Sequence, residues 1–216
     1  MLEVYLIRHA ECEMNLKPDI IAGRSNSSPL TITGKMQAMC LGKRFESECV
    51  TFTKVYSSPA LRAKDTALLS LLDPHMTIDD RLQEMDRGSW EGQTRSKMFT
   101  ADYRERLDVD NWHTGAPDGE SPGQVGLRGY SFLQEVIEPH KRGLFALYAH
   151  GGLIRFTLRE IMQFDANIAW MIPIENTSIT HIAYIKSRWV PIRINDYAHL
   201  SLMNESVKKE GIAVAT

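Results

Sequence analysis

Two histidines, His9 and His150, each follow a short apolar segment directly. Segments 4–7 and 144–149 are rich in Val, Ile, Leu and Tyr and are too short for independent helices, so they predict two buried strands. Ligands of open α/β sheets bind at the carboxyl ends of the strands. Two histidines at that edge could place a nitrogen nucleophile beside a phosphate. A single histidine after a strand is more often a loop or core residue, so the pair needs further residues.

Two arginines strengthen the case for an anion site. Arg8 ends the first predicted strand, where a buried guanidinium is costly unless an anion pairs with it. Arg62 lies in the first turn of a helix expected after segment 54–57, and a helix N-terminus carries partial positive charge. Arginine can bind phosphate through two parallel hydrogen bonds. Position alone leaves Arg62 equally compatible with a solvated surface.

Weaker candidates accompany these four residues. Gly151 and Gly152 follow the second histidine, and they leave backbone N–H groups free to approach an anion at a helix start. Asn15 could donate an amide N–H to a phosphate oxygen, although a lone Asn in a loop is a weak signal.

A carboxyl group is also needed, because the leaving alkoxide of a phosphate ester must take up a proton. Segment 82–92 supplies Glu84, Asp86 and Glu91. Charged loop residues are usually solvated, and spacing alone does not select one of the three.

Taken together, the motifs resemble the histidine phosphatase superfamily, also called the phosphoglycerate-mutase-like superfamily. The resemblance runs in the family's order from the first strand to about residue 200. Its blocks are 8–11 with Asn15, Gly23 with 28–34, 57–63, 82–84 with 88–92, 117–121, 150–152 and 176–179.

The resemblance implies a role for each site residue. His9 would be phosphorylated in the intermediate, and Glu84 would donate and accept the proton. His150, which we expect to be cationic against the phosphate, would be the third catalytic residue. The implied phosphate contacts besides His150 are Arg8, Asn15, Arg62 and the backbone N–H of Gly151.

Two residues depart from the family's pattern. Ala10 stands where Gly is usual, and since Ala is small we expect the pocket to survive. Cys12 stands where Ser or Thr is common. A thiol is a poor hydrogen-bond donor, so a hydroxyl contact to phosphate from that position is in doubt.

The elements that must position these residues alternate between strand and helix. We expect strands at 3–8, 54–57, 76–78 and 144–149, and a closing hairpin of 178–185 and 189–194. We expect helices at 34–47 with Thr33 as N-cap, after Ser58–Pro59 with Ser58 as N-cap, at 123–138 and at 151–162. This order predicts a three-layer α/β/α sandwich with a mostly parallel sheet, and the resemblance implies that the sandwich is phosphoglycerate-mutase-like. We expect one domain over 1–203, a cap insertion at 84–122 and a polar tail at 204–216.

The composition of this chain excludes several classes of partner. Its 216 residues carry a formal net charge of -2 without a basic run, so we expect no nucleic-acid partner. Without a signal peptide or an apolar stretch of membrane length, and with three cysteines lacking CxxC spacing, we expect a cytoplasmic protein without membrane contacts. Neither carboxylate clusters nor Cys/His spacing suggests a metal site, and we expect no cofactor. Oligomeric state stays open.

We therefore expect a phosphatase that hydrolyses a small phosphate monoester. One alternative is a phosphoglycerate mutase, an isomerase with the same phosphohistidine; mutases of the resembling family are usually longer. A non-catalytic binding protein on the same fold is the other alternative, and it would be expected to have lost one of the main site residues. The substrate is not readable from the sequence. Arg24, Arg87 and Arg128 are candidates for contacting a carboxylate or a second phosphate.

Overall fold

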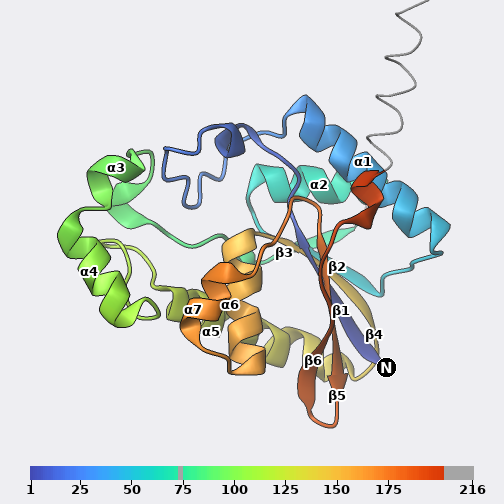
Figure 1. Ribbon diagram of the computed structural model, residues 1–216. Helices are drawn as coiled ribbons and strands as arrows, with labels where there is room; N and C mark the ends of the chain where they lie inside the picture. Colours follow the sequence, from blue (N-terminus) through green and yellow to red (C-terminus); the bar gives the residue numbers. More distant parts are fainter. Residues whose placement is uncertain (73–74, 202–216) are drawn as a thin grey trace, which may run out of the picture.

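A six-stranded sheet with the strand order β3-β2-β4-β1-β5-β6 forms the centre of the molecule (Figure 1). The computed structural model describes residues 1–72 and 75–201. The strands are β1 (Leu2–Arg8), β2 (Lys54–Ser57), β3 (Met76–Ile78), β4 (Gly143–Ala149), β5 (Ile179–Ile185) and β6 (Arg188–Asp196). β1 to β4 pair in parallel, whereas β5 and β6 form an antiparallel hairpin that extends the sheet beside β1.

Helices cover both faces of this sheet. The helices are α1 (Ile32–Ser47), α2 (Leu61–Leu71), α3 (Arg95–Met98), α4 (Ala101–Asp110), α5 (Pro122–Phe132), α6 (Gly151–Met162) and α7 (Ala166–Met171). α1 and α2 pack on one face, and α5 and α6 pack on the other (Figure 1). The expected three-layer α/β/α sandwich with a mostly parallel sheet is confirmed.

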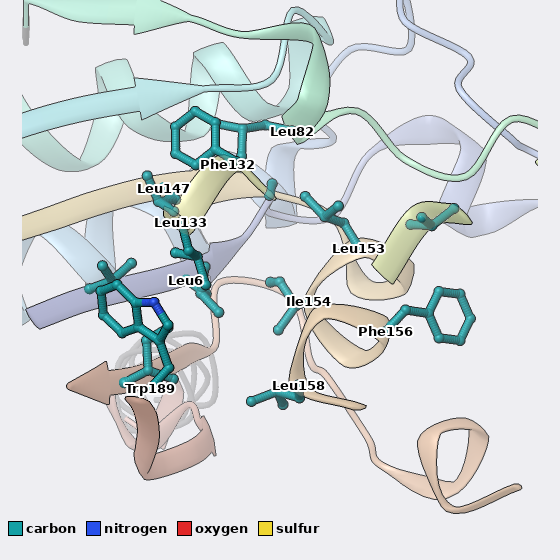
Figure 2. Close-up of a cluster of buried hydrophobic side chains, with 14 of the residues drawn as sticks. Leu6, Leu82, Phe132, Leu133, Leu147, Leu153, Ile154, Phe156, Leu158 and Trp189 are labelled. Carbon is teal, nitrogen blue, oxygen red and sulfur yellow. The ribbon is translucent and has the colours of Figure 1, made fainter. Parts of the chain in front are cut away.

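The alternation of β1 explains the two layers. Successive side chains of a strand point to opposite faces. Val4 and Leu6 therefore join the larger core, in which Leu153, Ile154 and Phe132 of α5 and α6 pack against the sheet (Figure 2). Tyr5 and Ile7 join the opposite core with residues of α1 and α2. Burial of both faces accounts for the nearly continuous apolar segment that the sequence shows.

The sheet register brings the candidate site together. β4 lies between β2 and β1, and its last residues pair with theirs, Ala149 with Arg8 and Tyr148 with Ser57. Because these strands are parallel, their carboxyl ends share one edge of the sheet. His9 and His150 therefore begin adjacent loops, as the sequence predicts.

Two helix starts differ from prediction. α1 begins at Ile32 with Thr31 as N-cap, whose Oγ1 accepts a hydrogen bond of 2.9 Å from the backbone N–H of Gly34; the expected cap, Thr33, lies inside the helix. α2 begins at Leu61, since Ala60 is still extended. Ser58 is not the N-cap, because the helix begins two residues later than expected; its hydroxyl accepts from the backbone N–H of Ala60 over 3.3 Å and is also hydrogen-bonded to His150.

The middle segment and the helix after it are also more detailed than expected. Segment 84–122 contains α3 and α4, which lie to one side of the sheet (Figure 1). The helix expected at 123–138 is α-helical from Pro122 to Phe132, and it continues as a π turn and then a 3₁₀ turn to His140. The expected polar tail at 204–216 lies outside the described residues, and the domain boundary at 203 stays a prediction. None of the helices in the described residues is long and apolar enough to span a bilayer.

Candidate active site

A cavity of about 390 Å³ opens at the carboxyl edge of the sheet. It contains every site residue predicted from the sequence except one: Arg8, His9, Asn15, Arg62, Glu84 and Gly151 line it. The exception is His150, which has no exposed surface and lies behind the cavity wall. Strand ends, helix starts and the loop at 82–92 thus converge on one space.

His9 presents one ring nitrogen for chemistry. Its Nδ1 lies 2.7 Å from the carbonyl oxygen of Ala10, so Nδ1 carries the hydrogen and donates it. Nε2 is then the unprotonated nitrogen. Burial, together with the guanidinium groups of Arg62 and Arg8, holds the pKa of His9 well below its usual 6.5. The imidazole is therefore neutral near pH 7, as a nucleophile requires.

His150 is neutral as well in this structure, and the expectation of a cation concerns the site with phosphate bound and stays a prediction. Nη2 of Arg62 donates to its Nδ1 over 3.1 Å, and its Nε2–H donates to Ser58 Oγ over 2.8 Å. Burial and the neighbouring Arg62 hold the pKa of His150 well below 6.5. A protonated Nδ1 could not accept the arginine's hydrogen bond. The ring centroids of His150 and His9 are 5.1 Å apart.

Arg62 is buried and Arg8 is half-buried, and neither has a carboxylate partner among the residues that the structure describes. The Nη1 atom of Arg8 donates to the carbonyl of Ile174 over 2.5 Å, and that of Arg62 donates to the carbonyl of Ser25 over 2.8 Å. These bonds fix both side chains while leaving their charges uncompensated. Burial lowers the pKa of each guanidinium. Uncompensated buried charge of this kind favours an anionic ligand.

Glu84 is the acid that geometry selects. Its carboxylate accepts hydrogen bonds from the backbone N–H of Met85 (2.8 Å) and of Gly152 (3.1 Å). The second bond holds it at the N-terminus of α6, facing the cavity. Asp86 instead pairs with Arg24 over 3.2 Å, and neither Asp86 nor Glu91 lines the cavity. The structure thus distinguishes Glu84 from Asp86 and Glu91, which sequence spacing alone does not.

The loop after His9 orients Asn15. Asn15 Oδ1 accepts hydrogen bonds from the backbone N–H of Cys12 (3.0 Å) and from its thiol (3.4 Å). The Asn15 amide nitrogen therefore keeps its hydrogens for a ligand. Cys12 thus holds the side-chain amide of Asn15. This role differs from the hydroxyl contact to phosphate that Ser or Thr at position 12 would offer. Ala10 is fully buried, and its N–H donates to Thr66 Oγ1 over 2.9 Å.

Three further arginines line the cavity. Arg87 was a candidate for a second anionic group, but Arg95 and Arg155 were not singled out. Arg155 lies four residues after Gly151, so the two residues share one face of α6. This helical spacing could have predicted from the sequence that Arg155 lines the cavity. The other two candidates are occupied elsewhere: Arg24 pairs with Asp86, and Arg128 pairs with Glu120 over 2.7 Å.

Fold and site together define the class of this protein. A family model, the histidine phosphatase superfamily (branch 1), matches residues 4–197. The chain belongs to this superfamily.

Named relatives fall into two activities. The chain is 32% identical over 207 residues to "Putative phosphoserine phosphatase 2" of Hydrogenobacter thermophilus, covering 92% of this chain and 98% of the relative. It is 30% identical over 194 residues to a "Probable phosphoglycerate mutase" of Salmonella arizonae, with 88% of each covered. The phosphatase expectation is supported, and the mutase alternative is not better supported.

A solved structure shares the fold. A phosphoserine phosphatase mutant from Entamoeba histolytica, in complex with phosphoserine, superimposes with a TM-score of 0.82 at 24% sequence identity. The match covers 93% of this chain and 100% of that one. Agreement over 93% of this chain confirms the phosphoglycerate-mutase-like fold.

Proposed function

We propose that this chain hydrolyses a small phosphate monoester through a phosphohistidine formed on His9. The observation that carries the proposal is the neutral imidazole of His9 beside two uncompensated guanidinium groups in one cavity. The hydrogen bond from Nδ1 to Ala10 directs the lone pair to Nε2, while Arg8 and Arg62 attract the phosphoryl group. Family membership supports the same reaction.

In the first step Nε2 of His9 attacks phosphorus and the ester P–O bond breaks. The departing alkoxide takes the proton of Glu84, whose carboxyl group faces the cavity. In the second step water attacks the phosphohistidine and gives its proton to Glu84. Inorganic phosphate leaves and His9 is regenerated, so each group ends as it began.

The remaining residues bind charge. Arg8, Arg62, Asn15 and the N–H of Gly151 would hold the phosphoryl oxygens. Donors arranged in advance stabilise the transition state, and removing one typically costs roughly 10²–10³ in rate. His150 would act first through Arg62, since its Nδ1 fixes that guanidinium. A bound phosphate dianion would favour its protonated form and allow it to share the charge.

The arginines supply the positive charge that a metal ion supplies in other phosphatases. We therefore propose a metal-independent reaction. Among residues 1–72 and 75–201, no group of three or more His, Cys, Asp or Glu side chains could hold a metal. Activity in the presence of a chelator such as EDTA tests this point.

The substrate class follows from chemistry shared with the relatives. The names of two similar proteins specify phosphoserine phosphatase, and the cavity offers arginines beyond those needed for one phosphate. O-phosphoserine is thus the first substrate to assay. Assays with 3-phosphoglycerate separate the two activities, because a phosphatase releases free phosphate and a mutase forms 2-phosphoglycerate.

The covalent step has a direct test. Rapid quenching with ³²P-labelled substrate, with EDTA present, should trap label on the protein. The label should survive base and be lost in acid, since a phosphoramidate is labile once its nitrogen is protonated. His9→Ala should abolish label and turnover, whereas Arg62→Ala should weaken both and leave the labelled residue unchanged. Full turnover in His9→Ala, or acid-stable label on Ser or Cys, would refute the mechanism.

A further inference from the structure

A second cavity adjoins the first. It has a volume of about 410 Å³, and Arg87, Arg95 and Trp170 line both cavities. Because three side chains are shared, a ligand that enters one cavity meets the wall of the other. The two volumes together suit a ligand far larger than a phosphoryl group on a three-carbon acid, since pockets for drug-sized ligands have about 300–1,000 Å³.

The junction of the two cavities is cationic. Arg87 is half-buried and has neither an ion pair nor a side-chain hydrogen bond within the described part of the chain. Burial lowers its pKa, and the charge of Arg95 lowers it further. Arg95 donates its Nε–H to the carbonyl of Pro18 over 2.7 Å, which leaves the rest of its guanidinium available. Two such cations at one boundary fit a carboxylate or a second phosphate on the ligand.

The second cavity has aromatic and aliphatic side chains on part of its wall, and the polar side chains of Asp108, Asn111, Thr114 and Asn167 also line it. Phe99 lines it from the end of α3, Tyr103 and Leu107 line it from α4, and Trp170 lines it from α7. The rings are held in place, because Tyr103 packs edge-on against Phe99 (centroids 5.4 Å apart) and Trp170 packs against Phe156 (5.0 Å). Rigid aromatic walls bind rings and other flat apolar groups.

The two sides of this cavity are linked. The side-chain amide of Asn111, at the end of α4, donates to that of Asn167 on α7, and both residues line the cavity. Figure 1 shows α4 and α7 on the same side of the sheet. Two elements that the candidate active site does not need for phosphate chemistry therefore form opposite sides of this open cavity.

We propose that the second cavity binds the body of the substrate's alcohol, which carries an anionic group for Arg87 and Arg95 and a ring-containing apolar part beyond it. This inference rests on the proposed phosphatase function and narrows its substrate. A three-carbon phosphorylated acid would reach the junction and leave the apolar walls unused.

Matched substrates isolate each part. N-benzoyl-O-phosphoserine and N-acetyl-O-phosphoserine have the same leaving group and carboxylate and differ in the ring. Because the benzoyl ring is buried in the second cavity and the acetyl group is not, kcat/KM for the benzoyl compound should be roughly 10- to 100-fold higher, which corresponds to about 1.4–2.8 kcal/mol. The methyl ester of the benzoyl compound lacks the carboxylate. Its kcat/KM should therefore be at most about one tenth of that of the acid.

Variants assign the two preferences to their residues. Leu107→Trp fills the second cavity and should reduce the benzoyl-to-acetyl ratio to about 1. Val109→Trp is the matched control, because Val109 lies on the same helix, is 84% exposed and lines neither cavity; its ratio should equal that of the wild type. Arg87→Met should remove the preference for the acid over the methyl ester while keeping the preference for the ring.

The outcomes separate this inference from the proposed function. If the wild type hydrolyses every compound with similar kcat/KM, the second cavity is no substrate site, although the phosphatase function stands. The same conclusion follows if Leu107→Trp folds and keeps the wild-type ratio. If no compound, including p-nitrophenyl phosphate, releases phosphate, the proposed function itself fails. The wild-type ratios decide the question even if a variant does not fold.

Discussion

The two site histidines are neutral for the same reasons, burial and the charge of Arg62, but they have opposite tautomers. His9 carries its hydrogen on Nδ1, which donates to the Ala10 carbonyl, and His150 carries it on Nε2, which donates to Ser58. The unprotonated nitrogen of His150 is occupied by Arg62, whereas that of His9 is free. Backbone and side-chain hydrogen bonds therefore decide which of two adjacent imidazoles can attack phosphorus.

At the scale of single residues, Glu84→Gln tests the proton donor. The amide keeps the shape of the carboxyl group but cannot protonate an alkoxide. For an alkyl ester such as O-phosphoserine, kcat should fall by about 10²–10⁴. For p-nitrophenyl phosphate, whose leaving group hardly needs a proton, the loss should be much smaller.

The comparison of O-phosphoserine with p-nitrophenyl phosphate also serves as a control. Equal losses with both esters would contradict the role of Glu84 as general acid. Asp86→Asn and Glu91→Gln provide the matched comparison, because both carboxylates lie outside the cavity. Neither should show a loss that depends on the leaving group.

Strand ends predicted that Arg8 and His9 would line the cavity, and the family resemblance added Glu84 and Asn15, but neither predicted how these side chains bond. Arg8 and His9 follow a strand that the apolar pattern reveals, so their place at the sheet edge was predictable. The neutral state of His150 was not, since it depends on Arg62 and Ser58, which are 88 and 92 residues away. Such contacts exist only once β2 and β4 have paired.

At the scale of elements, the N-terminus of α6 positions the acid. Glu84 comes from the loop after the 3₁₀ turn at Asp80–Leu82, and its carboxylate is held by the backbone N–H of Gly152. A Cβ atom at residue 152 would overlap the Glu84 carboxylate. Glycine is thus required at this position by the close approach of a side chain from another element.

Gly152→Ala should therefore impair Glu84 although residue 84 itself is unchanged. The methyl group must displace the carboxylate, so turnover of O-phosphoserine should fall by about 10-fold or more, while p-nitrophenyl phosphate is affected less. In the double variant with Glu84→Gln, the second substitution should add little, since both act on one group. Losses that multiply in the double variant would show that Gly152 acts through something other than Glu84.

The start of α1 shows a boundary that the local sequence pattern does not predict. Thr31 and Thr33 both precede an apolar-periodic segment, and either could cap α1. Thr31 is the N-cap because its loop packs against the loop that follows β1: the Thr31 N–H donates to the carbonyl of Glu11 over 3.1 Å, which fixes the extended backbone that an N-cap needs. That contact spans 20 residues and leaves no mark in the local pattern.

At the scale of the whole molecule, buried histidines link stability to pH. Burial lowers the pKa of His9, His150, His181 and His199, the last to about 4. Each is neutral in the folded protein at a pH where the unfolded chain, with a pKa near 6.5, already binds a proton. Stability from these groups is complete above pH 6.5 and is lost as the pH falls. The pairing of Asp196 with Arg44, which lowers the pKa of Asp196 to about 2, is lost only in stronger acid.

We predict that the free energy of unfolding decreases between pH 6.5 and pH 4, before most carboxylates are protonated. His199 provides the test because it is buried outside the cavity, with its Nε2 2.9 Å from Thr177 Oγ1. Its lowered pKa accounts for a loss on the order of 3 kcal/mol at pH 4. Urea unfolding at pH 7, 5.5 and 4 should show a shallower decrease in His199→Gln than in the wild type. His140→Gln, a change at an exposed site, should follow the wild type; identical slopes for all three proteins would mean that proton uptake by His199 does not contribute to acid unfolding.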